Sequence, residues 1–441
     1  MLLLHMESGH CGKVNKSKKH NIQCPMPFLH YNIKLDRKST ACWRCHENLG
    51  DYTQNSLLEV WHGDKWQDFR RQHLAGEKPA GCKSCWQMEE KGLESTRTVV
   101  LEEFAEQILE LEQMDLEQLL RPAFPEDIEI RFGNLCNLQC RHCNPAYSSQ
   151  WMKQLKTSDN YQEVVSFVED VNSRQSLTAL PQHTVEDLES LAPGLKYIKI
   201  TGGEPLMHPL HYKMLKALEG YEHNITLEYN TNLHYLGLGD QSVIDYWKKF
   251  KHVVCRVSID ADAKGYAYMR AHGDLDVLRK NWSTVEQEFR DRILDGTFDL
   301  HATCTVNVLN ITRIPQVLDL FSELGSKLHI SLVQYPLIMD ICNLPQWQKD
   351  EIIIVCRKLI EDQPTRQYTH WRFSDSNSRR YRDLVEYNVK NLKKIIGWLE
   401  RGSNAEFEKN FTRWMKLQDQ MNNNNLFDYY PEFEYLRPYY V

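Results

Sequence analysis

Apolar positions in residues 126–345 follow two alternating periods. Short apolar runs are each followed by a longer stretch in which apolar residues recur every three or four positions. The runs predict strands at Ile128–Phe132, Tyr197–Thr201, Ile225–Tyr229, Val253–Ile259, Leu300–Val308 and Leu328–Val333. The stretches predict helices at Tyr212–Leu218, Val243–Phe250, Trp282–Arg290 and Ile314–Leu324. Strands that alternate with helices build a parallel sheet with crossover helices, so we expect an α/β fold, a partial (β/α)6 TIM-like barrel.

The distribution of apolar, polar and cysteine residues divides the rest of the chain into four parts. Residues 1–24 are polar and Lys-rich and predict a poorly ordered tail. Residues 25–100 hold four clustered cysteines and many turn residues, which predicts a small cysteine-rich module. In 101–125, apolar residues at helical spacing predict a bridging helix that ends in a proline-containing linker. Beyond the barrel, 346–441 predicts a helical segment whose many aromatic side chains we assign to core.

Composition narrows the class of protein. The net charge of -7 gives no basic surplus, so we expect no nucleic-acid partner. The only apolar N-terminal run, Met1–Leu4, is too short for a signal peptide, and no apolar run is long enough to span a membrane. We therefore expect a cytoplasmic protein. In a reducing compartment, 13 clustered cysteines indicate metal binding rather than a disulfide framework.

Three cysteines directly follow the first predicted strand. Cys136, Cys140 and Cys143 are separated by three and then two residues. Three thiolates at this spacing can wrap one face of a [4Fe-4S] cluster and leave its fourth iron free to bind a small molecule. The alternative is a zinc site made by the three thiolates with His142 or a remote ligand.

The second predicted strand ends in two glycines, a glutamate and a proline, Thr201–Pro205. Glycines let a ligand approach the backbone closely, since they carry no Cβ. The carboxylate of Glu204 or the neighbouring carbonyl groups could then accept a hydrogen bond from an ammonium group. A tight turn that merely closes the strand is the other interpretation of this pattern.

Together the two motifs resemble the radical S-adenosylmethionine superfamily, with its CxxxCxxC loop and GGEP strand end. Many members carry an aromatic residue before the third cysteine, where this chain has His142, but the set of cysteines is intact. The resemblance covers roughly Ile128 to Pro345 and identifies the partial barrel as a radical SAM barrel. It implies a [4Fe-4S] cluster that binds S-adenosylmethionine at the three cysteines.

The same resemblance implies which residues hold the cofactor. The GGEP residues would hold the amino group of the methionine moiety, and the third and fourth strands end in segments similar to the family's TN and S-x-D segments. Arg270 is placed similarly to a carboxylate-binding arginine of peptide-modifying members. The implied cofactor-binding residues are Gly202, Gly203, Glu204, Asn232, Ser258, Asp260 and Arg270. For the polar ones, a capping or surface role is the alternative.

A second group of cysteines lies in the N-terminal module. Cys42 and Cys45 form one CxxC pair, and Cys82 and Cys85 form another. Four thiolates can saturate either zinc or an iron–sulfur cluster. The surroundings, Gly81–Trp86 above all, resemble the twitch module, a shortened relative of the SPASM module that holds an auxiliary iron–sulfur cluster. In most relatives this module follows the barrel, whereas here it precedes it.

Of the other cysteines, Cys255 and Cys304 lie in predicted strands and are assigned to core, while Cys11 and Cys24 lie in the polar tail.

The resemblance implies a radical enzyme. A low-potential electron donor, flavodoxin- or ferredoxin-like, would reduce the cluster, and S-adenosylmethionine would be cleaved to methionine and a 5′-deoxyadenosyl radical. This radical would abstract hydrogen from an unknown peptide or small-molecule substrate; no catalytic side chain is assigned. The auxiliary cluster would accept an electron or anchor the substrate. The alternatives are a two-cluster electron carrier, a zinc-stabilised binding module, and a radical SAM fold kept for binding alone.

Overall fold

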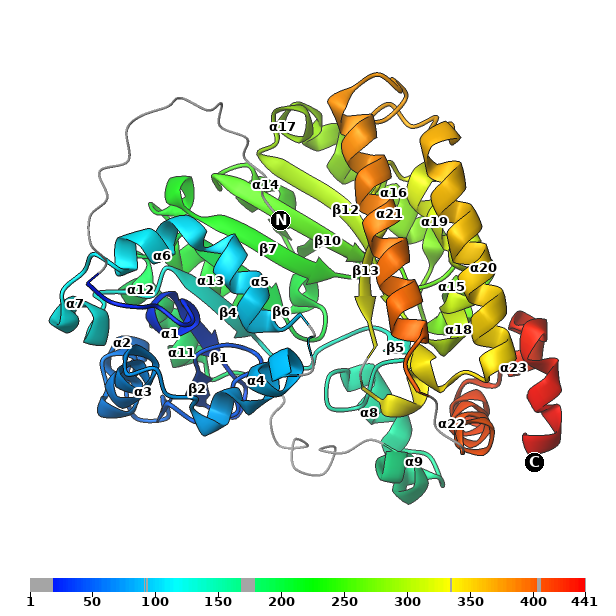
Figure 1. Ribbon diagram of the computed structural model, residues 1–441, viewed down its shortest axis with the longest axis horizontal. Helices are drawn as coiled ribbons and strands as arrows, with labels where there is room; N and C mark the ends of the chain where they lie inside the picture. The colour runs from blue at the N-terminus through cyan, green and yellow to red at the C-terminus, as the bar shows by residue number, and fades with distance from the viewer. Residues whose placement is uncertain are drawn as a thin grey trace. The chain divides into compact units, whose positions relative to one another are not determined.

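The computed structural model of the chain describes residues 19–90, 92, 94–167, 179–333, 335–402 and 406–440 (Figure 1). The described chain forms two compact units. Unit 1 comprises Met1–Arg131, Leu180–Lys199 and Lys213–Thr226. Unit 2 comprises Phe132–Ala179, Ile200–Tyr212 and Leu227–Val441. Cys11 lies outside the described residues.

The sheet of unit 1 is built around β1, a buried strand that the sequence analysis did not predict. Its strands are β1 (His30–Ile33), β2 (Lys38–Thr40), β3 (Gly50–Asp51) and β4 (Asp127–Arg131). The hairpin β1–β2 continues antiparallel to β3, while β1 pairs in parallel with β4, with His30 opposite Asp127. On its other side, β4 neighbours β6 (Tyr197–Thr201). The cysteine-rich module therefore shares a sheet with the first predicted barrel strand.

Short helices cover this sheet. They are α1 (Met26–Leu29), α2 (Leu57–Trp61), α3 (Asp64–Leu74), α4 (Lys83–Glu90), α5 (Thr96–Glu103), α6 (Ala105–Leu111), α7 (Leu116–Leu120), α11 (Gln182–Glu186) and α12 (Leu188–Leu191). The prediction of one bridging helix is wrong, because α5, α6 and α7 are separate. Asp115 accepts a hydrogen bond from the backbone of Gln118 and starts a new helix. The prediction of a polar tail also fails at its end, since Ile22 and Cys24 are buried.

The sheet of unit 2 holds the remaining predicted strands in sequence order. They are β7 (Thr226–Thr231), β10 (His252–Ser258), β12 (Phe298–Val306) and β13 (His329–Leu332), and the end of β6 adjoins β7. β10, β12 and β13 pair in parallel. All six strands of the two units that belong to the predicted barrel end within two residues of their predicted bounds. The α/β fold with parallel strands is confirmed.

One face of the unit 2 sheet is polar and the other is apolar. Along β12, Leu300, Ala302 and Cys304 are buried, and the residues between them are partly exposed. Cys255 on β10 is likewise fully buried, so both strand cysteines are core residues as predicted. The connecting elements are α8 (Ser149–Lys156), α9 (Tyr161–Phe167), α13 (Pro209–Ala217), α14 (Val243–Trp247), α15 (Tyr266–Met269), α16 (Leu275–Glu288), α17 (Arg290–Asp295), α18 (Val308–Ile311) and α19 (Ile314–Glu323). Short strand pairs are β5 (Gln139–Cys140) with β11 (Arg270–Ala271), and β8 (Gly237–Leu238) with β9 (Gln241–Ser242).

The C-terminal segment is helical, as predicted. It holds α20 (Gln346–Asp362), α21 (Arg379–Leu399), α22 (Phe407–Asn422), α23 (Leu426–Tyr429) and the 3-10 helix η7 (Pro431–Tyr439). α20 and α21 lie side by side in unit 2, and α21 packs on β13 (Figure 1). Trp414 and Tyr430 are fully buried, which confirms the assignment to core for these two aromatic residues.

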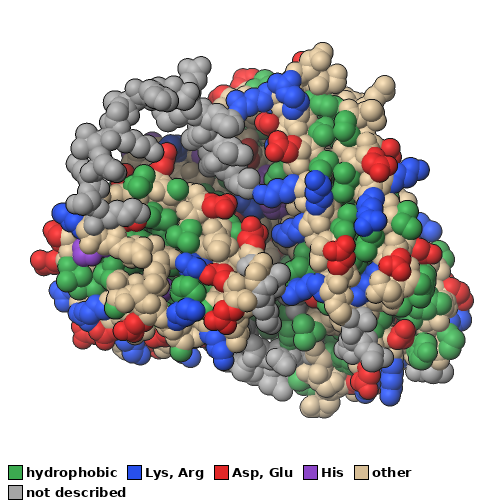
Figure 2. Space-filling model, in the orientation of Figure 1, with side chains coloured by type: hydrophobic (Ala, Val, Ile, Leu, Met, Phe, Trp, Pro, Cys, Tyr) green, Lys and Arg blue, Asp and Glu red, His purple; other side chains and the backbone are tan. Residues whose placement is uncertain are grey.

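Basic and acidic side chains are interspersed over the helices of unit 2 in Figure 2. None of the described helices combines the length and the apolar character that crossing a membrane requires.

Candidate functional site

The three-cysteine loop of unit 2 is held by a short strand pair. Within the loop, β5 pairs antiparallel with β11, which places Cys140 opposite Arg270. The backbone N–H of Cys143 donates to the carbonyl of Cys140 at 3.0 Å, so the loop turns back on itself between these two cysteines. The pairing fixes the middle of the loop to the segment that follows β10.

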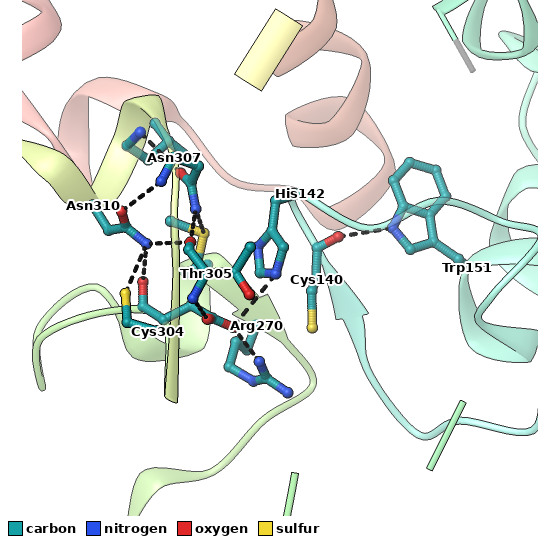
Figure 3. Close-up of polar contacts among 11 residues, drawn as sticks. Cys140, His142, Trp151, Arg270, Cys304, Thr305, Asn307 and Asn310 are labelled. Carbon is teal, nitrogen blue, oxygen red and sulfur yellow. Dashed lines mark hydrogen bonds and ion pairs between the residues drawn. The ribbon is translucent and has the colours of Figure 1, made fainter. Parts of the chain in front are cut away.

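Side chains at the start of α8 fix the backbone of the same loop. Ser149, Ser148 and Trp151 donate hydrogen bonds to the carbonyl oxygens of Cys136, Leu138 and Cys140, at 3.2, 2.6 and 3.0 Å respectively. The bond from Trp151 to Cys140 is drawn in Figure 3. Alternate carbonyl groups of the loop are therefore satisfied by protein donors, which holds the loop in one conformation.

The three thiols have an environment that suits metal ligands. Burial raises the pKa of Cys143 to about 12, and it also raises the pKa of Cys136 and of Cys140. Coulombic repulsion from Cys140 acts in the same direction on the other two. Thiolates gathered in this way are stable only when a cation compensates them, and an iron–sulfur cluster does so because bound thiols are deprotonated. The donor set fits a cluster.

The glycine-rich strand end lies directly against the cysteine loop. Gly203 donates its backbone N–H to the carbonyl of Gly133 at 3.1 Å, and Glu204 donates to Leu135 at 2.7 Å. A Cβ at Gly203 would lie 2.2 Å from the carbonyl oxygen of Leu135. The close approach that requires glycine here is thus made by the backbone of the cysteine loop. Gly202 has a φ of 121°, which also favours glycine.

The carboxylate of Glu204 joins two strand ends. It is buried and accepts hydrogen bonds from the hydroxyl of Thr231 at 2.6 Å and from the backbone N–H groups of Asn232 at 2.6 Å and Leu206 at 3.1 Å. Burial raises the pKa of Glu204, and these three bonds act against that rise. A carboxylate has about four acceptor positions, so roughly one is left for an incoming donor.

Asn232 links the end of β7 to the cysteine loop. Its side-chain amide donates to the side-chain oxygen of Asn137 at 2.8 Å, and Asn137 lies directly after Cys136. The amide oxygen of Asn232 accepts from the backbone of His234 at 3.0 Å. Both functional groups of Asn232 are thus used within the protein.

Asp260 and Arg270 form a buried ion pair beside the loop. The other oxygen of Asp260 accepts from the backbone N–H of Thr305 at 2.7 Å, and His142 lies 3.4 Å from the paired oxygen (Figure 3). Burial acts to lower the pKa of Arg270, but Cys140 and Asp260 outweigh it and raise this pKa overall. Nε of Arg270 is buried and has no hydrogen-bond partner among the described residues. Ser258 ends β10, half-buried, opposite Thr303.

The module in unit 1 brings its two CxxC pairs together. His46 donates its backbone N–H to the carbonyl of Gly81 at 3.1 Å, and a Cβ at Gly81 would lie 2.5 Å from Glu47. The thiols of Cys45 and Cys82 are hydrogen-bonded to each other, which lowers the pKa of Cys45 and raises that of Cys82. The backbone contact explains why glycine precedes the second pair.

Cys24 joins this cysteine group. One cavity is lined by the thiol-bearing residues Cys24, Cys42, Cys82 and Cys85, together with His73 and Arg97. Burial raises the pKa of Cys24 to about 12, with Coulombic repulsion from Cys85 and Cys45 acting the same way. Nε2 of His73 lies 3.8 Å from the sulfur of Cys82. Four thiols and an imidazole thus line one cavity, a donor set that fits an iron–sulfur cluster.

No three His, Cys, Asp or Glu side chains converge on the position of a single metal ion in the described part of the chain. A cubane offers a separate iron to each thiolate, so its ligands stand further apart than those of one zinc ion.

Sequence reasoning missed Cys24 because a polar segment precedes it. The signal was the apolar run that follows, since Met26–Ile33 is typical of a buried element and Cys24 lies only two residues before it. It also missed Asn137 and the donors at the start of α8. Ser148 and Ser149 carry only the signal of a helix N-cap.

Comparison with protein families places residues 24–86 in SPASM, an iron–sulfur cluster-binding domain. The match begins at Cys24 and includes both CxxC pairs, so the chain contains an iron–sulfur cluster-binding domain and the auxiliary-cluster prediction is confirmed. No curated protein matches the chain.

Several solved structures are similar to the chain at low identity. Native anSMEcpe with bound AdoMet and Kp18Cys peptide is 14% identical, with a TM-score of 0.35, over 54% of this chain and 61% of that one. SuiB of Streptococcus suis bound to the precursor peptide SuiA is 14% identical, with a TM-score of 0.36, over 60% of each chain. The chain spans about three fifths of the length of these structures.

Proposed function

We propose that the chain is a radical S-adenosylmethionine enzyme with an auxiliary iron–sulfur cluster. The observation that carries the proposal is the pairing of the three-thiol loop with the GGEP strand end through backbone bonds from Gly203 and Glu204. A loop with three thiolates leaves one iron of a cubane for a small molecule, and the strand end borders it. When bound, the cluster and cofactor would supply reductive cleavage to a 5′-deoxyadenosyl radical.

In unit 2, the side chains that would bind the cofactor have hydrogen-bond donors or acceptors that suit its polar groups. Glu204 keeps about one acceptor position for the amino group of the methionine moiety. Buried Nε of Arg270 is a donor without a partner in the described chain, and it suits the carboxylate. Ser258 is half-buried at the carboxyl end of β10, where it suits the carboxylate or the ribose. Asp260 and Asn232 support the site by holding Arg270 and the loop.

The chain's own residues would then orient the cofactor and exclude water. Gly202 and Gly203 leave the strand end free of side chains, and the buried ion pair of Asp260 with Arg270 fixes the guanidinium. A low-potential donor, flavodoxin- or ferredoxin-like, would deliver the electron. The substrate would be a peptide or a small molecule, and the cluster in the module would accept an electron from it or anchor it.

Anaerobic reconstitution tests the proposal. Two cubanes correspond to about eight irons per chain, and dithionite with S-adenosylmethionine should give 5′-deoxyadenosine. Replacing Cys136, Cys140 and Cys143 with alanine should abolish this product and remove about half the iron. Full iron with no 5′-deoxyadenosine would favour the electron carrier, and a colourless zinc protein would favour the binding module. Cleavage at the wild-type rate by the triple variant would refute the assignment of the loop.

For the module we propose that Cys24 belongs to the ligand set with Cys42, Cys82 and Cys85, because these four thiols line the cavity. In the background that lacks the three loop cysteines, Cys24→Ser should lower the iron content and change the electron paramagnetic resonance spectrum of the reduced cluster. Cys356→Ser is the matched control, since Cys356 is a buried cysteine in α20. A Cys24→Ser cluster that is unchanged in both respects, with Cys45→Ser losing iron, would assign the ligand set to the two CxxC pairs alone.

A further inference from the structure

Arg141 lies inside the cysteine loop, but its charge is paired with a residue outside the loop. It follows Cys140 directly, and its side chain is fully buried. Its guanidinium lies 2.9 Å from the carboxylate of Asp419 on α22, and its carbon centre lies 4.1 Å from the ring of Tyr268. Its Nε donates to the carbonyl of Tyr268 at 3.1 Å. The loop is thus joined by a buried ion pair to a helix near the C-terminus.

Asp419 collects donors from several parts of the C-terminal segment. It accepts from the backbone N–H of Leu426 at 2.7 Å and from the hydroxyl of Tyr440, besides the hydroxyl of Tyr268 at 3.3 Å. The carboxylate is 2% exposed, so these contacts replace its hydration. One side chain therefore ties α22, α23 and the end of η7 to the cysteine loop.

The neighbour of Asp419 completes the set of bonds to the loop backbone. Gln418 donates its side-chain amide to the carbonyl of Arg141 at 3.1 Å. The start of α8 already holds the carbonyls of Cys136, Leu138 and Cys140. Because α22 supplies the fourth bond, the part of the loop between Cys140 and Cys143 depends on the C-terminal helix for its conformation.

α22 also supports the helix that supplies the other three donors. Trp414 stacks on Trp151, with ring centres 6.0 Å apart and planes inclined by 14°. Further along, Gln420 accepts from Asn160 at 2.9 Å. α22 thus donates one hydrogen bond to the loop itself and packs against α8, whose first turn donates the other three.

A buried ion pair often adds little stability compared with apolar residues of similar size, and in some proteins its role is instead to fix one geometry. With its charge balanced by Asp419, Arg141 brings little net charge to the loop. We propose that Arg141 and Asp419 are positioning residues of the three-cysteine site, and that the C-terminal segment is therefore a part of the cofactor site. The inference rests on the proposed function, since it assigns these residues to the cluster that binds S-adenosylmethionine.

The test separates positioning from stability. Replacing both partners, as Arg141→Met with Asp419→Asn, removes the pair without leaving a buried unpaired charge. The amide oxygen of the new side chain can still accept from the backbone of Leu426 and the hydroxyl of Tyr440, so the fold should melt within a few degrees of the wild type. Two readouts follow in the reconstituted full chain: the rate at which an iron chelator removes each cluster, and the change that S-adenosylmethionine causes in the electron paramagnetic resonance spectrum. We expect chelation of the loop cluster to be at least about tenfold faster and the spectral change to be lost, with the module cluster unaffected.

Glu432→Gln is the matched control. Glu432 holds the same C-terminal segment through Arg313, at 2.8 Å, and through Thr312, at 3.0 Å, away from the loop. It should lower the melting temperature and leave both readouts unchanged. Asp419→Asn, which leaves Arg141 unpaired, should lose the loop cluster and also melt lower. A double variant that keeps wild-type chelation and the spectral change would overturn the inference.

The outcomes also separate this inference from the proposed function. If S-adenosylmethionine causes no spectral change at the loop cluster of the wild-type protein, the proposed function is wrong. The chelation rates would still decide whether Arg141 and Asp419 hold the loop.

Discussion

At the scale of single residues, the packing of the protein's own backbone already requires glycine at position 203. Its Cβ position is filled by the carbonyl of Leu135, at 2.2 Å. We expect Gly203→Ala to displace the cysteine loop and to remove about half the iron, while the module cluster stays. Gly397→Ala in α21 is the control, since nothing lies within 4 Å of its Cβ position and alanine favours a helix. Iron analysis with spectra of both variants measures this, and full iron in Gly203→Ala would contradict it.

Glu204 is expected to stabilise the fold as well as the site. Its two oxygens face three donors, so in Glu204→Gln the new amide must point its own N–H groups at another donor. An unsatisfied buried group of this kind costs about 1–3 kcal/mol. Unfolding in urea without any cluster or cofactor should reveal this loss. Stability equal to the wild type would mean that the three bonds contribute nothing and that Glu204 serves only a ligand.

Site residues could be predicted from the sequence where the residues of one site lie close together along the chain. Both CxxC pairs and the three-cysteine loop are visible because their spacing is set by the size of a cluster. Arg141 was not predictable, since its partner Asp419 lies on a distant helix and neither residue carries a motif. The glycines were correctly singled out, but for Gly203 the approaching group is backbone from Leu135.

At the scale of elements, a buried histidine makes the contact of α13 with β7 sensitive to pH. Nε2 of His211 lies 2.8 Å from the hydroxyl of Tyr229, and burial lowers the pKa of His211 from 6.5 to about 3. Below pH 6.5 His211 is protonated in the unfolded chain but stays neutral in the folded chain. The contribution of the neutral His211 to the free energy of unfolding is therefore fully present above pH 6.5 and is lost as the pH falls.

We therefore expect His211→Gln to flatten the acid side of the stability profile. Relative to the variant, the wild type should lose about 1 kcal/mol by about pH 5.5. Unfolding curves at a series of pH values measure the difference between the two proteins. Parallel profiles would show that His211 keeps its ordinary pKa in the fold.

The elements themselves followed closely from the sequence where periodicity is strong. The strands of the predicted barrel were placed within two residues, because each is an apolar run between polar turns. The strands β1, β2 and β3 were missed, since two of them have three residues or fewer and show no alternation. The bridging helix was predicted too long because its apolar spacing continues through the cap at Asp115.

At the scale of the whole molecule, the module is built into the sheet rather than appended to it. In unit 1, β1 is hydrogen-bonded between β2 and β4. Deleting residues 1–100 would leave β4 as an unpaired edge and uncover its buried residues Ile128, Glu129 and Ile130, which favours aggregation. We expect the shortened chain to be insoluble, as sedimentation of the expressed protein would show. The full-length double variant Cys42→Ser, Cys82→Ser lacks two cluster ligands but keeps β1, so it should stay soluble. If this variant is as insoluble as the shortened chain, solubility depends on the cluster rather than on β1.

The place of β1 also sets an order of events during synthesis. Its hairpin partner β2 leaves the ribosome at once, whereas β4 follows only after the whole module has been made. The module's thiols can therefore meet iron before the first residue of the three-cysteine loop has been translated. Placing the module first therefore gives the nascent chain a β1–β2 hairpin with one open edge, and β4 is the strand that closes this edge.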